Sequence, residues 1–175
     1  MDPRARRGAM ILFGTAAGVF LADRLTKVWA EHSLAQHPVD VIGGVLTLRF
    51  TTNSGGAFSL GQSAPWFFAA ATLVVSALIV LTAFRLRSVL ASVALGLILG
   101  GALGNLADRA FRGPSLRGHV VDFIDLHWWP VFNLADSAVV IGAILMAVWS
   151  FRQDRGRQDR GRTTRREDEA VGDDA

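Results

Sequence analysis

Two aspartates, Asp122 and Asp136, lie in apolar surroundings where a carboxylate is costly. Asp122 falls inside an apolar run at residues 120–124, and Asp136 stands at the start of a long apolar segment. An ionisable side chain near lipid usually has a function, because an unpaired charge there is unfavourable. Two carboxylates that meet can share one proton and act as an acid and a base. The two residues therefore suggest acid–base chemistry, provided that the fold brings them together.

Asp108 and Asp125 compete for membership of such a pair. Asp125 shares the apolar-flanked segment of Asp122, so the sequence separates these two only weakly. Asp136 ranks high because no cation lies near it in the sequence to neutralise it. The residue types alone do not select two of the four aspartates.

The composition is that of a membrane protein. Of the 175 residues, 51% are hydrophobic, and they cluster in long runs instead of alternating with charges. The absence of cysteine excludes disulfides, thiolate catalysis and cysteine metal sites within the chain. The net charge of +3 is small and the arginines gather at the two ends. We interpret them as topology signals and expect no nucleic-acid partner.

Four apolar stretches predict a mainly α-helical membrane protein with four transmembrane helices. The predicted spans are residues 8–29, 64–84, 89–108 and 131–151. The predicted outer loops are residues 30–63 and 109–130, with a cytoplasmic N-terminus at residues 1–7 and a disordered cytoplasmic tail at residues 152–175. The first apolar run also resembles a cleaved signal peptide, and this alternative stays open.

The placement of arginines predicts the orientation. Basic residues at the N-terminus, between the second and third spans, and after the fourth span would all lie on one side of the membrane. Such an excess marks the cytoplasmic side, so both termini should face the cytoplasm. On the outer side, residues 45–51 predict a strand and residues 53–56 a turn. We therefore expect a small β element on the outer membrane surface.

This topology brings the polar residues of three spans and both outer loops to one leaflet. They are Asp23, Lys27, Asn53, Asn105, Asp108, Arg109, Asp122, Asn133 and Asp136. A shared site at the outer edge of the membrane explains their convergence most simply.

Several of these residues also have purely structural interpretations. Asp23 and Lys27 are four positions apart, so they can pair on one helix face and neutralise each other near lipid. Gly96, Gly100 and Gly104 follow small-xxx-small spacing, which favours close helix packing over catalysis.

Two other kinds of chemistry receive weaker support. His119 and His127 flank the Asp122 segment and could join aspartates around a metal ion, but no recognised ligand spacing is present. Ser54 and Lys27 could form a nucleophile pair, although nothing in the local sequence favours it. We expect no metal and no cofactor.

Five sequence motifs follow one another along the chain. They are Asp-Arg-Leu-Thr-Lys at residues 23–27, Asn-Ser-Gly-Gly-Ala-Phe-Ser at 53–59, Gly-Gly-Ala-Leu-Gly-Asn-Leu-Ala-Asp-Arg at 100–109, Val-Val-Asp-Phe at 120–123, and Phe-Asn-Leu-Ala-Asp-Ser at 132–137. With them the chain resembles lipoprotein signal peptidase, also called signal peptidase II, the aspartic endopeptidase family of bacterial membranes. The resemblance covers roughly residues 8–151.

The resemblance implies the roles of the polar residues. Asp122 and Asp136 would be the catalytic pair that activates water. The supporting or substrate-binding residues would be Asn53, Asn105, Asp108, Arg109, Asn133, Asp23 and Lys27. The implied substrates are prolipoproteins, cleaved before a diacylglyceryl-modified lipobox cysteine, by a multi-pass protein of the bacterial plasma membrane with its site at the outer leaflet. We expect a monomer in contact with membrane lipid.

Two functions of other classes stay open as alternatives. A small proton-coupled transporter would also carry intramembrane acids, but it would distribute them through the membrane depth. Here the cytoplasmic halves of the spans are nearly free of charge, which argues against an ion path. A non-catalytic assembly factor could use the polar face to bind a partner.

Overall fold

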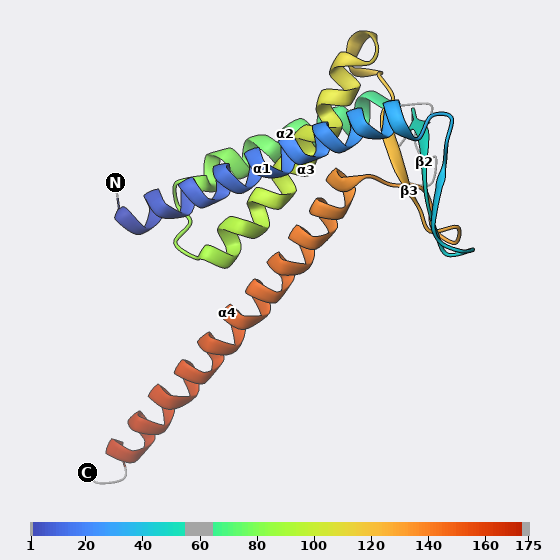
Figure 1. Cartoon of the computed structure of the whole chain (residues 1–175). Helices are drawn as coiled ribbons and strands as arrows, with labels where there is room; N and C mark the ends of the chain where they lie inside the picture. The colour runs from blue at the N-terminus through green and yellow to red at the C-terminus, as the bar shows by residue number, and fades with distance from the viewer. Residues whose placement is uncertain (1, 55–64, 173–175) are drawn as a thin grey trace.

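The computed structural model describes residues 2–54 and 65–172, in which four α-helices carry a small sheet at one end (Figure 1). The elements in chain order are α1 (Pro3–Ser33), β1 (Val39–Ile42), β2 (Leu46–Asn53), α2 (Pro65–Ala83), α3 (Val89–Phe111), the 3-10 turn η2 (Pro114–Leu116), β3 (Val120–Asp125) and α4 (Leu134–Gly172). The sheet lies where α1 ends and α4 begins, and both termini lie away from it.

Three helices are long and apolar enough to cross a membrane. They are α1, α3 and the part of α4 that runs over Leu134–Gln153. The described apolar part of α2, Ala69–Ala83, is shorter than a span. The structure thus confirms a mainly helical chain with three candidate membrane helices. A total of four spans, with one at residues 64–84, stays a prediction.

Glycines on α3 let α1 approach it closely. A Cβ atom at Gly96 would lie 2.7 Å from the carbonyl oxygen of Leu12, and one at Gly100 would lie 2.6 Å from that of Ala16. No real Cβ fits at such distances, so the small-xxx-small spacing serves helix packing, as predicted. Leu12, Ala16 and Leu99 are buried in the core at this crossing.

The sheet is antiparallel throughout, in the order β1-β2-β3. Thr51 of β2 pairs with Asp122 of β3, so the sheet fixes the position of this aspartate. Ala30 and Leu34 of the α1 end pack beneath Phe123. Because of these contacts, β3 is held against both the second strand and the first helix.

The strand predicted at residues 45–51 is confirmed as β2, but it continues to Asn53. Asn53 therefore lies in a strand and not in the predicted turn, whose glycines, Gly55 and Gly56, lie outside the described residues. The structure also contains β3, where the sequence predicted only a loop. Its β-branched and aromatic residues are typical of strands.

Two helix ends differ from the prediction. The first helix runs over Pro3–Ser33 instead of residues 8–29. The sequence predicted a disordered tail from residue 152, whereas in the structure α4 continues to Gly172. This stretch has no proline, and arginine, a good helix former, is its commonest residue.

The α1–α3 crossing yields a first prediction. Gly100→Ala should lower the thermal unfolding midpoint in detergent, because the new Cβ must displace the backbone of α1, at a cost of about 1–3 kcal/mol. The matched control is Gly18→Ala on α1, where a Cβ meets nothing within 4 Å. There we expect an unchanged or slightly raised midpoint, since alanine favours helix. Equal losses in both variants would contradict the packing role of Gly100.

Candidate active site

Asn133 joins the two aspartates at the start of α4. Its side-chain amide donates to Asp122 Oδ1 at 2.6 Å, and its backbone N–H donates to Asp136 Oδ2 at 3.2 Å. In return, the backbone N–H of Asp136 donates to Asn133 Oδ1 at 3.0 Å. This reciprocal pattern is that of a capping box, in which Asn133 caps the helix. One buried residue thus holds a carboxylate from β3 and another from α4.

Two further asparagines complete the hydrogen bonding of the pair. Asn105 of α3 donates to Asp136 Oδ1 at 2.8 Å, and Asn53 of β2 donates to Asp122 Oδ2 at 3.3 Å. Asn133 also donates to Asn105 Oδ1 at 3.1 Å. Each of the four carboxylate oxygens therefore accepts a hydrogen bond from an asparagine, and each asparagine comes from the predicted set.

Arg109 supplies positive charge beside the pair. Its guanidinium donates to the carbonyl oxygen of Asn105 at 3.2 Å. It also interacts electrostatically with both Asp122 and Asp136. A cation in this place weakens the repulsion between two neighbouring carboxylates.

The proton affinity of Asp122 is unusual. Burial, together with the negative charge of Asp136, raises the pKa of Asp122 from 3.8 to about 6. Hydrogen bonds from Asn133 and Asn53 and the charge of Lys27 act in the opposite direction, but burial dominates. Asp122, whose residue surface is only 2% exposed, therefore holds a proton at a pH where an ordinary aspartate is ionised.

Asp125 lies outside this arrangement although it shares a strand with Asp122. It pairs with Arg49 of β2 at 2.5 Å and accepts the backbone N–H of His127 at 2.8 Å. The hydrogen bond from Arg49 lowers the pKa of Asp125 below its ordinary value. Among the four competing aspartates, the structure brings Asp122 and Asp136 together and gives Asp125 a partner within the sheet.

A buried ionic cluster lies next to the pair, which it contacts through Asn105. Lys27 is fully buried, and its Nζ lies 2.8 Å from Asp23 Oδ2 and 2.8 Å from Asp108 Oδ2. It also donates to Asn105 Oδ1 at 2.9 Å. The predicted pairing of Asp23 with Lys27 is confirmed. The ammonium group of Lys27 is buried against these partners, whereas Ser54 is exposed. The geometry therefore does not support a Ser54–Lys27 nucleophile pair.

Asp108 has cationic partners that the sequence analysis missed. They are Arg24 of α1 and Arg112, which follows α3 and also pairs with Glu31. Arg112 stands four positions after Asp108, and this spacing on one helix face was the available signal.

The described residues contain no group of three or more histidine, aspartate or glutamate side chains arranged to hold a metal ion. His127 instead contacts Thr47 Oγ1 through Nε2 at 2.9 Å.

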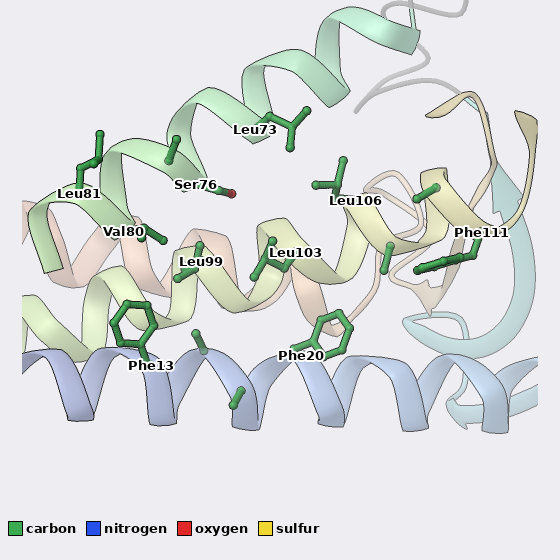
Figure 2. Close-up of a pocket in the computed structure, with 15 residues that line it drawn as sticks. Phe13, Phe20, Leu73, Ser76, Val80, Leu81, Leu99, Leu103, Leu106 and Phe111 are labelled. Carbon is green, nitrogen blue, oxygen red and sulfur yellow. The ribbon is translucent and has the colours of Figure 1, made fainter. Parts of the chain in front are cut away.

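An apolar groove lies apart from the aspartates. It has a volume of about 920 Å³ and is formed between α1, α2 and α3, where Phe13, Phe20 and Leu103 point into it (Figure 2). None of the predicted site residues lines it. In this chain the hydrogen bonding of the carboxylates, and not the volume of a cavity, locates the candidate chemistry.

Known proteins with the same motifs match most of the chain. The family model described as signal peptidase (SPase) II matches residues 15–152. The lipoprotein signal peptidase of Rhodococcus jostii is 43% identical over 149 residues, which cover 84% of this chain and 75% of that protein. The lipoprotein signal peptidase of Mycobacterium avium is 46% identical over 152 residues, which cover 84% of this chain and 82% of that protein.

Solved structures support the same relationship. A bacterial membrane enzyme that is 29% identical superposes with a TM-score of 0.72, over 82% of this chain and 88% of that one. A second bacterial membrane enzyme, 30% identical, has a TM-score of 0.67 over 78% of this chain and 90% of the other. The chain therefore belongs to the signal peptidase II family, a family of multi-pass membrane proteases.

Proposed function

We propose that this chain is an aspartic endopeptidase that removes signal peptides from prolipoproteins, cleaving before a lipobox cysteine that carries diacylglyceryl. The supporting observation is the bridge that Asn133 makes between Asp122 and Asp136. The names of the relatives supply the substrate class. The shared proton of two neighbouring carboxylates supplies the chemistry.

The two aspartates take different roles. Asp136 lies in the first turn of α4, where the helix dipole favours a negative charge, and it accepts two hydrogen bonds. It is the base. Asp122 is buried and has a raised pKa, so it carries the proton and is the acid.

Cleavage then follows from these roles. Asp136 takes a proton from a water molecule held between the carboxyl groups, and the water oxygen bonds to the scissile carbonyl carbon. Asp122 gives its proton to the carbonyl oxygen. The carbon–nitrogen bond breaks when the carbonyl re-forms, the proton on Asp136 passes to the leaving amine, and the proton of the collapsing hydroxyl returns to Asp122.

The surroundings suit a lipid-linked substrate. The pair stands at the end of the bundle that carries the sheet, beside the amide groups of Asn53 and Asn105 and the guanidinium of Arg109. These groups can orient a peptide backbone by hydrogen bonds. We place this end at the outer leaflet of the bacterial plasma membrane, with four spans, both termini in the cytoplasm and a single chain as the working unit.

A direct assay tests the proposal against its rivals. The purified protein is mixed with a diacylglyceryl-modified lipobox peptide, and cleavage before the cysteine is followed by mass spectrometry. A folded wild-type protein that never cleaves would remove the peptidase and return the transporter and the assembly factor to consideration.

Substitution of the pair gives a sharper prediction. Asp122→Asn and Asp136→Asn should each reduce turnover by at least roughly 100-fold, because each removes an acid or a base. Asp125→Asn is the matched control, with the same chemical change on the same strand, and it should keep turnover close to that of the wild type. Initial rates on the lipobox peptide provide the measurement. Normal turnover in either of the first two variants would exclude that residue from catalysis.

The raised pKa of Asp122 predicts a pH dependence. The required form has Asp122 protonated, so kcat/KM should fall as the pH rises through about 6, the pKa of this carboxyl. The charges that act on it belong to Asp136, Lys27 and Arg109. Asp125→Asn should show the same profile. A kcat/KM that rises through this pH would instead make Asp122 the base.

The same shift predicts a cost in stability. Folding raises the pKa of Asp122 from 3.8 to about 6. Ionised Asp122 therefore lowers the free energy of unfolding above about pH 6, the folded-state pKa, whereas below 3.8 the carboxyl is protonated in both states and has no such cost. Asp122→Asn should therefore stabilise the protein at pH 7.5, by up to roughly 3 kcal/mol, and leave stability near pH 4 unchanged. Thermal midpoints in detergent at both pH values test this. Asp125→Asn should instead lower the midpoint at pH 7.5, since Arg49 stabilises that carboxylate.

A further inference from the structure

The ammonium group of Lys27 lies among three oxygen atoms, with two of which it forms ion pairs and with the third a hydrogen bond. An ammonium group has three N–H donors. Here its Nζ lies 2.8 Å from Asp23 Oδ2, 2.8 Å from Asp108 Oδ2 and 2.9 Å from Asn105 Oδ1. Because the side chain is fully buried, it joins α1 to α3 at a fixed point behind the catalytic pair.

Each of the two carboxylates holds the residue that precedes a catalytic aspartate. Asp23 Oδ1 accepts the backbone N–H of Ala135 at 3.0 Å, immediately before Asp136. Asp108 Oδ2 accepts the backbone N–H of Val121 at 3.4 Å, immediately before Asp122. One cation therefore connects the backbone of α4 with the backbone of β3.

The third contact of Lys27 fixes the orientation of an amide. An ammonium group can only donate, so Asn105 must turn its oxygen toward Lys27 and its nitrogen the other way. That nitrogen donates to Asp136 at 2.8 Å. The same Asn105 oxygen accepts from Asn133, whose amide also donates to Asp122. The orientation set by Lys27 thus reaches both carboxylates.

We propose that Lys27 is a positioning residue that sets the separation and alignment of Asp122 and Asp136 through Asp23, Asp108 and Asn105. The proposal rests on the catalytic role given to the pair above. Lys27 touches neither substrate nor reacting atoms. Its loss shifts the pair by a fraction of an ångström to an ångström, and misplacement on that scale reduces the rate by up to about 100-fold.

The competing explanation is charge compensation alone. A buried carboxylate without a partner destabilises a protein strongly, so Lys27 could serve stability without affecting alignment. Without Lys27, Asp108 would keep its ion pairs with Arg24 and Arg112. The ion pair described for Asp23 is the one with Lys27. Removing Lys27 and the charge of Asp23 together therefore keeps the charges balanced.

The double variant Lys27→Met/Asp23→Asn tests this distinction. The asparagine can still accept the N–H of Ala135, but the bridge from α4 to β3 is gone. We expect kcat on the lipobox peptide to fall about 10- to 100-fold, with KM unchanged within twofold. A kcat within twofold of the wild-type value in the folded double variant would overturn the positioning role.

Gly104→Ala tests the same contact without any change of charge. A Cβ atom at Gly104 would lie 2.5 Å from Asp23 Oδ2, so it displaces this carboxylate. Gly18→Ala, in open space on α1, is the matched control. We expect a fall in kcat of tenfold or more for Gly104→Ala and none for the control. Equal kcat values in the two variants would also overturn the proposal.

A third measurement needs no substrate and so separates this proposal from the proposed function. Carboxyl ¹³C NMR follows the titration of the aspartate pair, with signals assigned by Asp122→Asn. The gap between the two apparent pKa values of the pair reflects the distance between the carboxylates. We expect this gap to change by at least about half a unit in Lys27→Met/Asp23→Asn. An unchanged gap would overturn the proposal even in a protein that cleaves its substrate.

Discussion

Buried carboxylates require hydrogen-bond donors or cations, and this requirement determines how the end of the bundle that carries the sheet is built. Asp23, Asp108, Asp122 and Asn133 are nearly or fully buried there, together with Lys27. Each carboxylate finds partners on other elements of the chain, since water is largely excluded. The helices and the sheet are consequently joined at this end by a continuous polar network, and not by apolar packing alone.

The network can form only because α3 lies close to its neighbours. Gly104 leaves the space that the Asp23 carboxylate occupies, while Gly100 and Gly96 allow α1 to approach about one and two turns away along α3. The small residues and the polar cluster therefore depend on each other. Without the glycines the cation of Lys27 could not contact both α1 and α3, and without the polar contacts the close approach would not orient the end of α1.

The sequence predicted local features well and long-range partners poorly. The pairing of Asp23 with Lys27 and the packing of Gly96 and Gly100 follow from helical spacing, and both are confirmed. The ion pair between Arg24 and Asp108 joins residues 84 positions apart, so no local pattern could indicate it. The strand β3 was missed for a similar reason, because its partner β2 lies about 70 residues earlier. The choice of Asp122 over Asp125 needed family motifs, since the two aspartates differ in partners that only the fold brings to them, such as Asn133 at Asp122 and Arg49 at Asp125.

Asp122 lies on a strand and Asp136 on a helix, which explains why many hydrogen bonds from other elements surround the pair. Two aspartates on one helix would have a spacing set by the helix itself. Asp122 and Asp136 instead belong to elements whose relative position depends on tertiary contacts. Their spacing must therefore be imposed by residues that touch both sides, and Asn133 does so directly. The ionic cluster behind them does so through the backbone, where Asp108 holds β3 and Asp23 holds α4. A pair assembled in this way combines a buried carboxyl whose pKa is raised to about 6 with one that lies in the first turn of a helix, a combination that a single element would not provide.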